Sequence, residues 1–183
     1  MNKMDFQITS VKKKIEIIES RFLKSSGLNV DLSVYPLPKS DNHQVTTNKE
    51  KSDKHGEVFT PLWLVDEMLE RYDEWEDQEK TTHDLCAGYG QFSIRMLRKK
   101  YCVLGERFDL DKFLTETHLF SELQPNSCFH LLYTFGTDIR LLIGDIMQIG
   151  KLPDSAERGI WVGFENEEEK KYDWYDKTEK IKG

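Results

Sequence analysis

The chain has 183 residues, about the length of one domain, and its composition argues against several kinds of protein. No run approaches the roughly 20 apolar residues of a membrane-spanning helix, so no membrane association is expected. The three cysteines form no C-x-x-C pair, which argues against a metal site or a disulfide framework and suits a cytoplasmic protein. The net charge of −7 argues against DNA binding through an overall basic surface.

The N-terminal third divides into two segments of different composition. Residues 1–28 carry apolar side chains at helical spacing, with three consecutive lysines between them, and predict an N-terminal helical arm. Such an arm would either pack on the domain or bind a partner. Residues 29–55 contain two prolines that favour extended backbone and a polar run with little to bury. They are predicted to be a linker.

Residues 56–164 are predicted to form one α/β domain, which opens with a helix. Thr60 is a suitable N-cap and Pro61 a suitable first helical residue. The apolar residues that follow line one face of this helix: Leu62, Val65, Leu69 and Tyr72. Acidic residues end the helix near Asp77, before the next strand.

A short strand ending at Asp84 breaks into a glycine turn and opens a helix over residues 91–100. Gly88 and Gly90 permit a tight turn and the close approach of a ligand, and the helix N-terminus presents free amides. Ser93 stands where a dinucleotide fingerprint has its third glycine. The acid before the glycines favours a ligand that carries an amino group. A turn that needs glycine only for its geometry is the alternative.

Strands and helices alternate after this turn. Residues 101–106 are predicted to be a second buried strand and residues 139–146 a third, with helical stretches at 111–123 and 126–135 between them. A fourth strand is predicted at residues 160–164. The alternation predicts an α/β fold with about four mostly parallel strands flanked by helices.

Three acidic residues are predicted at the C-terminal ends of these strands: Asp84, Glu106 and Asp145. Ligands of open parallel sheets bind at that edge. Each acid alone could be a surface carboxylate, but three acids on one edge favour a binding site. The remaining residues, 165–183, are rich in charge and are predicted to be a solvated tail.

Four segments resemble motifs of the N6-adenine DNA methyltransferases, with the modification subunits of type I restriction systems as the nearest picture. Gly56-Glu57-Val58-Phe59-Thr60-Pro61 resembles a segment that lies against the methionine end of S-adenosyl-L-methionine. Asp84-Leu85-Cys86-Ala87-Gly88-Tyr89-Gly90 resembles the D-P-x-x-G-x-G cofactor turn, with Leu85 replacing the usual proline. Gly105-Glu106 resembles the ribose-binding acid. Gly144-Asp145-Ile146 resembles the acid that contacts the adenine amino group, with an apolar neighbour.

The resemblance covers residues 56–147 and implies a partial Rossmann-like methyltransferase sheet that binds S-adenosyl-L-methionine. The cofactor-binding residues that it implies are Phe59, Thr60, Pro61, Asp84, Ala87, Gly88, Gly90, Glu106, Asp145 and Ile146. Carboxylates suit this ligand because its α-amino group, ribose diol and adenine amine all donate hydrogen bonds.

The sequence departs from the family at the catalytic segment. Family members place [NDS]-P-P-[YF] after the fourth strand, where it holds and stacks the flipped adenine. No two prolines of this chain are adjacent, and the acidic run Glu165-Asn166-Glu167-Glu168-Glu169 follows the predicted fourth strand. Such a run would repel a phosphate backbone. No catalytic residue is therefore assigned, and the chain alone is expected not to methylate DNA.

Three functions are compatible with these observations. The favoured one is a truncated or split subunit that binds S-adenosyl-L-methionine and reaches DNA only through a partner chain carrying the catalytic segment and target recognition. The second is a non-catalytic interaction protein that regulates or interferes with a restriction–modification complex. The third is an active transferase with an unrecognised catalytic segment, or another nucleotide-dependent enzyme on the same fold.

Overall fold

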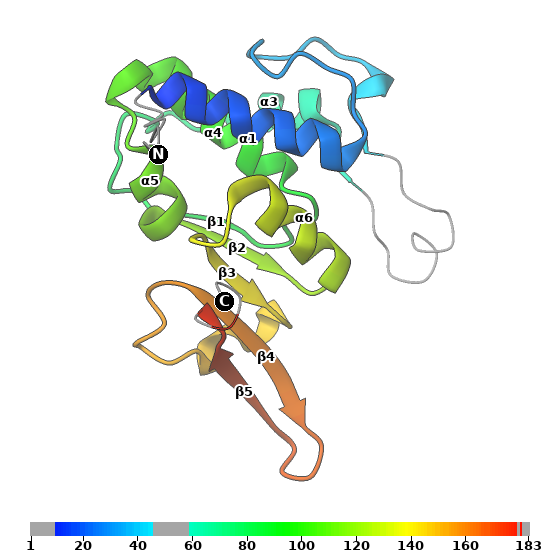
Figure 1. Ribbon diagram of the computed structural model, residues 1–183, viewed down its shortest axis with the longest axis vertical. Coiled ribbons are helices and arrows are strands. Elements are labelled where there is room, and N and C mark those ends of the chain that lie inside the picture. Colours follow the sequence, from blue (N-terminus) through cyan, green and yellow to red (C-terminus); the bar gives the residue numbers. More distant parts are fainter. Residues whose placement is uncertain (1–9, 46–58, 179, 181–183) are drawn as a thin grey trace, which may run out of the picture.

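The computed structural model describes residues 10–45, 59–178 and 180 and has an α/β architecture (Figure 1). Its single sheet has five strands in chain order: β1 Thr82–Asp84, β2 His118–Glu122, β3 Arg140–Ile143, β4 Ile160–Asn166 and β5 Lys171–Asp176. The first four strands are parallel and β5 is antiparallel to β4. The predicted α/β class with a mostly parallel sheet is confirmed.

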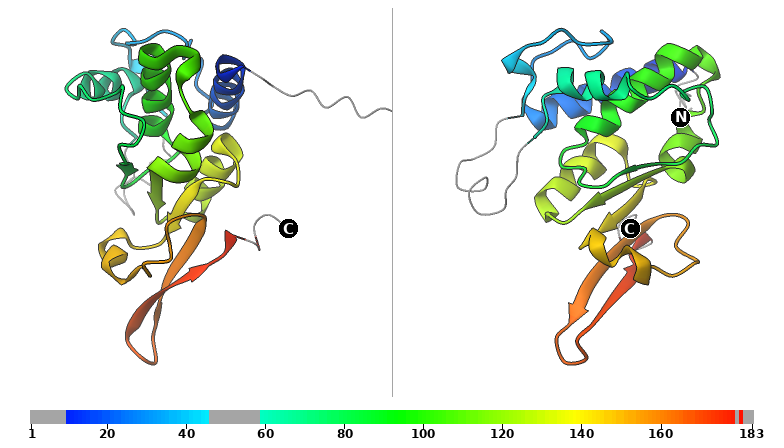
Figure 2. Two further views of the ribbon diagram at one scale, coloured as in Figure 1. Left: turned by 90° about the vertical axis from the view of Figure 1, so that its left-hand side faces the viewer. Right: turned by 180° about the vertical axis from the view of Figure 1, so that it is seen from behind.

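Helices cover one face of the sheet and part of the other (Figures 1 and 2). The α-helices are α1 Val11–Ser26, α3 Leu62–Leu69, α4 Gln91–Leu104, α5 Leu110–Lys112 and α6 Pro125–Phe135. Four short helical turns join them: η1 Asp41–His43, η2 Gly105–Arg107, η3 Phe113–Thr117 and η4 Ile146–Lys151. None of the helices in the described ranges is both long and apolar enough to cross a membrane.

Alternating side chains of the strands build two apolar clusters. Phe120, Leu141 and Ile160 point to the face where α1, α4 and α6 pack, and they belong to the main core. Leu142 and Trp161 point to the opposite face, where a smaller cluster forms with residues of β5 and η4. This alternation is the period of two that a pleated strand imposes on its side chains.

The predicted N-terminal arm packs on the domain over the part that the structure describes. Ile15 and Phe22 of α1 are fully buried against the main core. Glu19, on the same face, pairs with Arg98 of α4, and both side chains are nearly inaccessible to solvent. The helix ends at Ser26 and is followed by Gly27, whose left-handed conformation provides the usual C-terminal cap. Residues 1–9 of the predicted arm lie outside the described ranges.

The prediction of a linker does not hold for residues 29–45. Leu32 and Leu37 are buried, and Leu37 donates its backbone amide to the Asp66 carboxylate at 2.7 Å. The guanidinium of Arg95 binds two carbonyl oxygens of the same segment. Few apolar residues are present here, but side chains from α3 and α4 satisfy the backbone polar groups and fix the segment. Residues 46–55 of the predicted linker are not among the described ones.

The predicted strand at residues 101–106 is wrong. Tyr101 to Leu104 form the last turn of α4, and Glu106 lies in η2. The second strand is β2, which lies within the stretch 111–123 predicted as helix. The reason is tertiary packing, because Leu104 continues the buried helical face that begins at Ile94.

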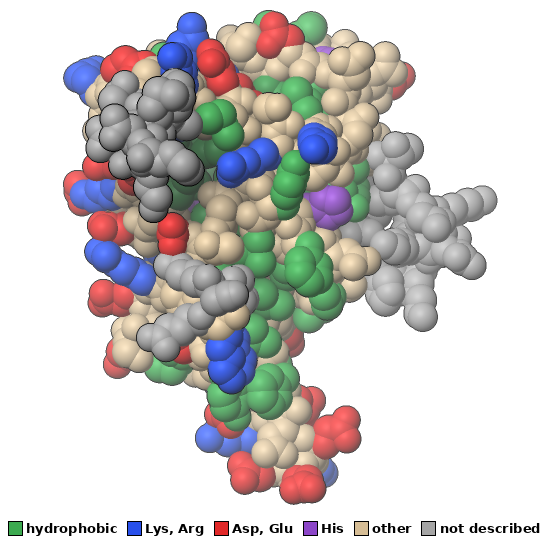
Figure 3. All heavy atoms as spheres, viewed as in Figure 1, with side chains coloured by type: hydrophobic (Ala, Val, Ile, Leu, Met, Phe, Trp, Pro, Cys, Tyr) green, Lys and Arg blue, Asp and Glu red, His purple; other side chains and the backbone are tan. Residues whose placement is uncertain are grey.

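The C-terminal residues also differ from the prediction. The fourth strand is confirmed as β4, but the expected solvated tail contains β5, which pairs with β4 along its length. Trp174 of β5 is buried in the smaller cluster and donates its indole N–H to the carbonyl of Gln148. The two strands form a hairpin that projects from the body of the molecule (Figure 1). Acidic side chains gather at its tip (Figure 3).

The other predicted elements occur with shifted bounds. Helix α3 ends at Leu69 rather than near Asp77, and its N-cap residue is Pro61 rather than Thr60. Helix α6 and strand β3 lie where they were predicted, and Pro125 occupies the first turn of α6.

Candidate functional site

The candidate site lies at the C-terminal ends of β1, β2 and β3, where the chain turns from β1 into α4. Gly88 and Gly90 have φ angles of 54° and 94°, in the region that favours glycine. A Cβ atom on Gly88 would lie 2.8 Å from Cε1 of Phe59, and one on Gly90 would lie 2.5 Å from Cε2 of Phe135. Both the conformation and the close packing of the turn therefore require glycine.

Glu122 at the end of β2 is a candidate site residue that no motif in the sequence indicated. Its carboxylate accepts the Gly88 amide on Oε2 at 2.7 Å and the amides of Leu123 and Gln124 on Oε1 at 2.8 and 2.7 Å. The second strand thus ends in an acid, as expected of the fold, but this acid is Glu122 and not Glu106. The proline that opens α6 at position 125 marks the preceding strand end and could have indicated it.

Asp145 lies at the end of β3, close to where Glu122 ends β2. One carboxylate oxygen, Oδ1, accepts the Met147 amide at 2.9 Å, and the Asp145 backbone amide donates to the Tyr172 hydroxyl at 2.8 Å. A cavity of about 130 Å³ opens between the strand ends. The residues that line it are Leu85, Cys86, Glu122, Leu123, Gly144, Asp145 and Ile146.

This cavity combines two carboxylates with apolar side chains from three loops. Its volume is below the roughly 300 Å³ at which drug-sized ligand sites begin. In its present shape it could enclose only one part of a nucleoside-containing ligand, and the remainder would lie along the sheet edge toward the glycine turn.

Asp84 lies beside the turn, but its carboxylate points inward. Its Oδ2 atom accepts the Ser93 hydroxyl at 2.7 Å, and Ser93 also donates its backbone amide. Burial raises the pKa of Asp84 to about 6, an effect that the Ser93 hydrogen bonds oppose and the charge of Glu122 increases. The carboxylate therefore holds the first turn of α4 against β1.

A network of buried side-chain hydrogen bonds continues from Asp84 to the neighbouring strand β2. The Ser93 hydroxyl lies 2.8 Å from Nε2 of His118, and Nδ1 of His118 lies 2.7 Å from the Thr82 hydroxyl. Burial, together with nearby positive groups, lowers the pKa of His118 to about 3, so the ring is neutral at physiological pH. These hydrogen bonds hold β1, β2 and α4 together beneath the candidate site.

The segment before α3 reaches the same turn. The Phe59 ring is buried against Gly88, and its centroid lies 4.7 Å from that of Tyr89, which stacks on His130 at 3.7 Å. Ala87 is buried and donates its amide to the Ser121 carbonyl at 2.9 Å.

The fold therefore brings most of the predicted cofactor residues to one edge of the sheet: Phe59, Asp84, Ala87, Gly88, Gly90, Asp145 and Ile146. Thr60 and Pro61 follow Phe59 directly and lead into α3. Residues 56–58, the start of the predicted motif, are outside the described ranges.

Glu106 is the predicted site residue that the fold places elsewhere. It follows the C-terminal end of α4, and the 14 residues of that helix span roughly 20 Å from the glycine turn. Its carboxylate accepts the amide of Val11 at 3.0 Å and that of Lys12 at 3.4 Å. Glu106 thus caps α1, as an acid at a helix N-terminus commonly does.

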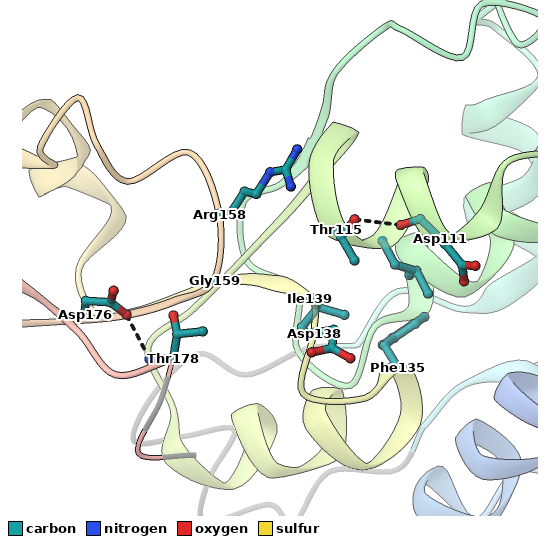
Figure 4. A pocket seen from close by; sticks show the side chains of 10 residues that line it. Asp111, Thr115, Phe135, Asp138, Ile139, Arg158, Gly159, Asp176 and Thr178 are labelled. Carbon is teal, nitrogen blue, oxygen red and sulfur yellow. Dashed lines mark hydrogen bonds between the residues drawn. The ribbon is translucent and has the colours of Figure 1, made fainter. Parts of the chain in front are cut away.

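A second cavity, of about 710 Å³, lies at the opposite edge of the sheet, where the parallel strands begin (Figure 4). Its polar side chains already have partners: Arg158 pairs with Glu116, Asp111 with Lys14, and Asp176 accepts the Thr178 amide. Ligands of parallel α/β sheets bind at the C-terminal edge. The smaller cavity beside the glycine turn is therefore the stronger candidate.

Among the described residues, no group of three or more His, Cys, Asp or Glu side chains is arranged to hold a metal ion. Comparisons of the chain with protein-family models, with curated proteins and with solved structures found no match.

Proposed function

We propose that the C-terminal edge of the sheet binds S-adenosyl-L-methionine and that the chain is the cofactor-binding part of an N6-adenine DNA methyltransferase-like assembly in the cytoplasm. One observation carries the proposal: Glu122 and Asp145, from neighbouring parallel strands, line one cavity beside a glycine turn. The ligand offers an adenine amine and a ribose diol, which are hydrogen-bond donors that carboxylates accept well.

We assign one part of the ligand to the end of each of the three strands. Asp145 accepts the adenine amino group, and Ile146 with Leu123 provides apolar contact to the ring. Glu122 accepts the ribose hydroxyls in place of Glu106, with the oxygen that also binds the Gly88 amide. The methionine part extends toward the glycine turn and Phe59.

No residue of this chain is proposed to catalyse methyl transfer. The segment that follows β4 is the acidic connection to β5, which opposes the approach of a phosphate backbone. We assign the catalytic segment and the recognition of DNA to a partner chain, so that the chain contacts DNA only within that complex.

The substitution Asp145→Asn is expected to weaken S-adenosyl-L-methionine binding by about tenfold or more, since a hydrogen bond to a charged group contributes about 1.5–3 kcal/mol. Asparagine keeps an oxygen for the Met147 amide, so the fold should be retained. Isothermal titration calorimetry of the purified chain measures the affinity. Glu106→Gln is the matched control and should bind as the wild type does. Equal affinity in Asp145→Asn, or no binding by the folded wild type, would contradict the proposal.

The projecting hairpin supports the second candidate, a non-catalytic interaction protein. The rings of Phe164 and Tyr175 stack at 4.5 Å on this hairpin, and both are exposed, by 48% and 40%. Exposed aromatic side chains are enriched at protein interfaces. The acidic tip beside them suits a partner with a basic surface.

If this candidate holds, the chain should inhibit DNA methylation by a purified type I modification complex, and the double variant Phe164→Ser, Tyr175→Ser should inhibit at least tenfold less. A radiolabelled methyl-transfer assay with increasing amounts of the chain tests this. Equal inhibition by the two forms would exclude the hairpin as the contact, and no inhibition would exclude this candidate.

A further inference from the structure

The strand β1 forms one edge of the sheet and is open on its outer side. Over the described residues it pairs with β2 alone, so the backbone N–H and C=O groups on its other side have no strand partner. An unpaired edge is a template on which an extended segment can add as a further strand. Because β1 has only three residues, Thr82–Asp84, side-chain contacts must supply much of the affinity for such a segment.

A groove of about 320 Å³ lies directly beside this edge, at the start of β1. Thr82 lines the groove and faces the side of the sheet where α4 packs, since its hydroxyl lies 2.7 Å from Nδ1 of His118. A strand added beside Thr82 would therefore place alternate side chains over the groove. The apolar side chains that would receive them come from α3, α4 and the segment after α3: Met68, Leu69, Tyr72, Trp75 and Met96.

The segment that borders the groove is strongly acidic. Residues 70–80, which connect α3 to β1, contain six acidic and two basic side chains. Glu74 pairs with Lys80, which lines the groove, whereas Asp73 and Glu76 are exposed and form no ion pair within the described ranges. Charge complementarity therefore favours an incoming segment that carries lysine or arginine.

We infer that β1 and this groove receive an extended segment of a partner protein, with apolar side chains at alternate positions and basic residues at its ends. Main-chain hydrogen bonds to the edge, pockets for alternate side chains and opposite charge are the three features by which sheets bind peptides in this way. The surface lies at the start of β1, whereas the proposed ligand lies beyond its end, so the inference does not depend on that ligand.

A synthetic peptide that alternates valine and threonine between two pairs of lysines is the probe, and fluorescence anisotropy of the labelled peptide measures its binding to the full chain. Saturable binding is expected. The same peptide with every internal amide N-methylated, or with glutamate in place of lysine, should bind about tenfold more weakly or less.

Two variants of the chain locate the contact. Met68 is 47% exposed, so Met68→Lys should keep the fold, and it should weaken binding about tenfold or more because it places a charge in the apolar groove and repels the peptide. Met147→Lys adds the same charge at an exposed methionine of η4 and should bind the peptide as the wild type does.

Each contrary result would overturn the inference. No binding by the folded wild type would mean that the edge does not accept such a segment. Equal binding of the N-methylated peptide would show contact without strand pairing, and equal binding of the glutamate peptide would contradict the charge argument. Equal affinity in Met68→Lys would place the peptide elsewhere, for example on the outer edge of β5. None of these measurements involves S-adenosyl-L-methionine, so they leave the proposed function to its own test.

Discussion

Replacing Arg95 with methionine is expected to lower the free energy of unfolding by about 3–5 kcal/mol, the usual cost of breaking a buried ion pair. Arg95 and Asp66 are completely buried, and two hydrogen bonds of 2.6 and 2.7 Å join them. The same guanidinium binds the carbonyls of Leu32 and Val34. Methionine would fill part of the space but leave Asp66 charged and buried, and the Asp66 carboxylate would keep the hydrogen bond from the Leu37 amide.

Urea unfolding followed by circular dichroism measures this loss. Lys99→Met is the matched control on the same helix, because its pair with Glu70 is partly exposed and should contribute less than about 1 kcal/mol. The double variant Arg95→Met, Asp66→Asn should recover part of the loss, since it removes the unpaired charge. A loss below about 1 kcal/mol in Arg95→Met would show that the pair does not hold the 29–45 segment in place.

Protonation of His118 is expected to lower the stability of the protein between about pH 6.5 and pH 3, because the unfolded chain binds this proton at a higher pH than the folded chain does. The pKa of His118 is about 3 in the fold, below its ordinary value of 6.5. Because folding lowers the pKa of His118, its contribution to the free energy of unfolding is complete above the pKa of the unfolded chain and is lost as the pH falls through the pKa of the folded protein. Asp84 acts in the opposite direction: its raised pKa of about 6 gives a contribution that is present below 3.8 and lost as the pH rises through 6.

Unfolding free energies at about pH 7 and pH 4 distinguish these two contributions. His118→Gln should reduce the difference between the free energies of unfolding at the two pH values, since glutamine does not titrate and can still bind Ser93. Asp84→Asn should increase the difference, because it removes the opposing contribution and stabilises the chain at the higher pH. An unchanged difference in His118→Gln would mean that another group controls the acid sensitivity.

Local signals in the sequence were enough to predict the strand–turn–helix at the centre of the site. Gly88 and Gly90 require particular backbone angles, and the apolar positions of α4 follow in helical spacing. The same kind of signal failed at residues 101–106. Tyr-Cys-Val-Leu is as suitable for a buried strand as for the last turn of a helix, and only its packing on the core decides between them.

The side-chain directions in the site could not be read from the sequence. Asp84 was expected to face a ligand, but Ser93 and His118, from two other elements, turn it inward. Glu122 was not predicted at a strand end, because the stretch 111–123 that contains it was predicted to be helical. Asp145 and Ile146 were predicted at the edge where they lie, since β3 is a short apolar run that ends clearly at Gly144.

The order of the strands has a consequence for how the chain folds. Each strand pairs with the next one along the chain, so that Leu119 meets Arg140 and Leu141 meets Ile160. The hairpin β4–β5 closes the shortest loop and β1–β2 the longest, because all of α4 and α5 lies between Thr82 and His118. Closing a longer loop costs more chain entropy, so pairing should spread from the C-terminal hairpin toward β1. The glycine turn, which depends on β1 and β2 being side by side, is then among the last parts of the molecule to take its final shape.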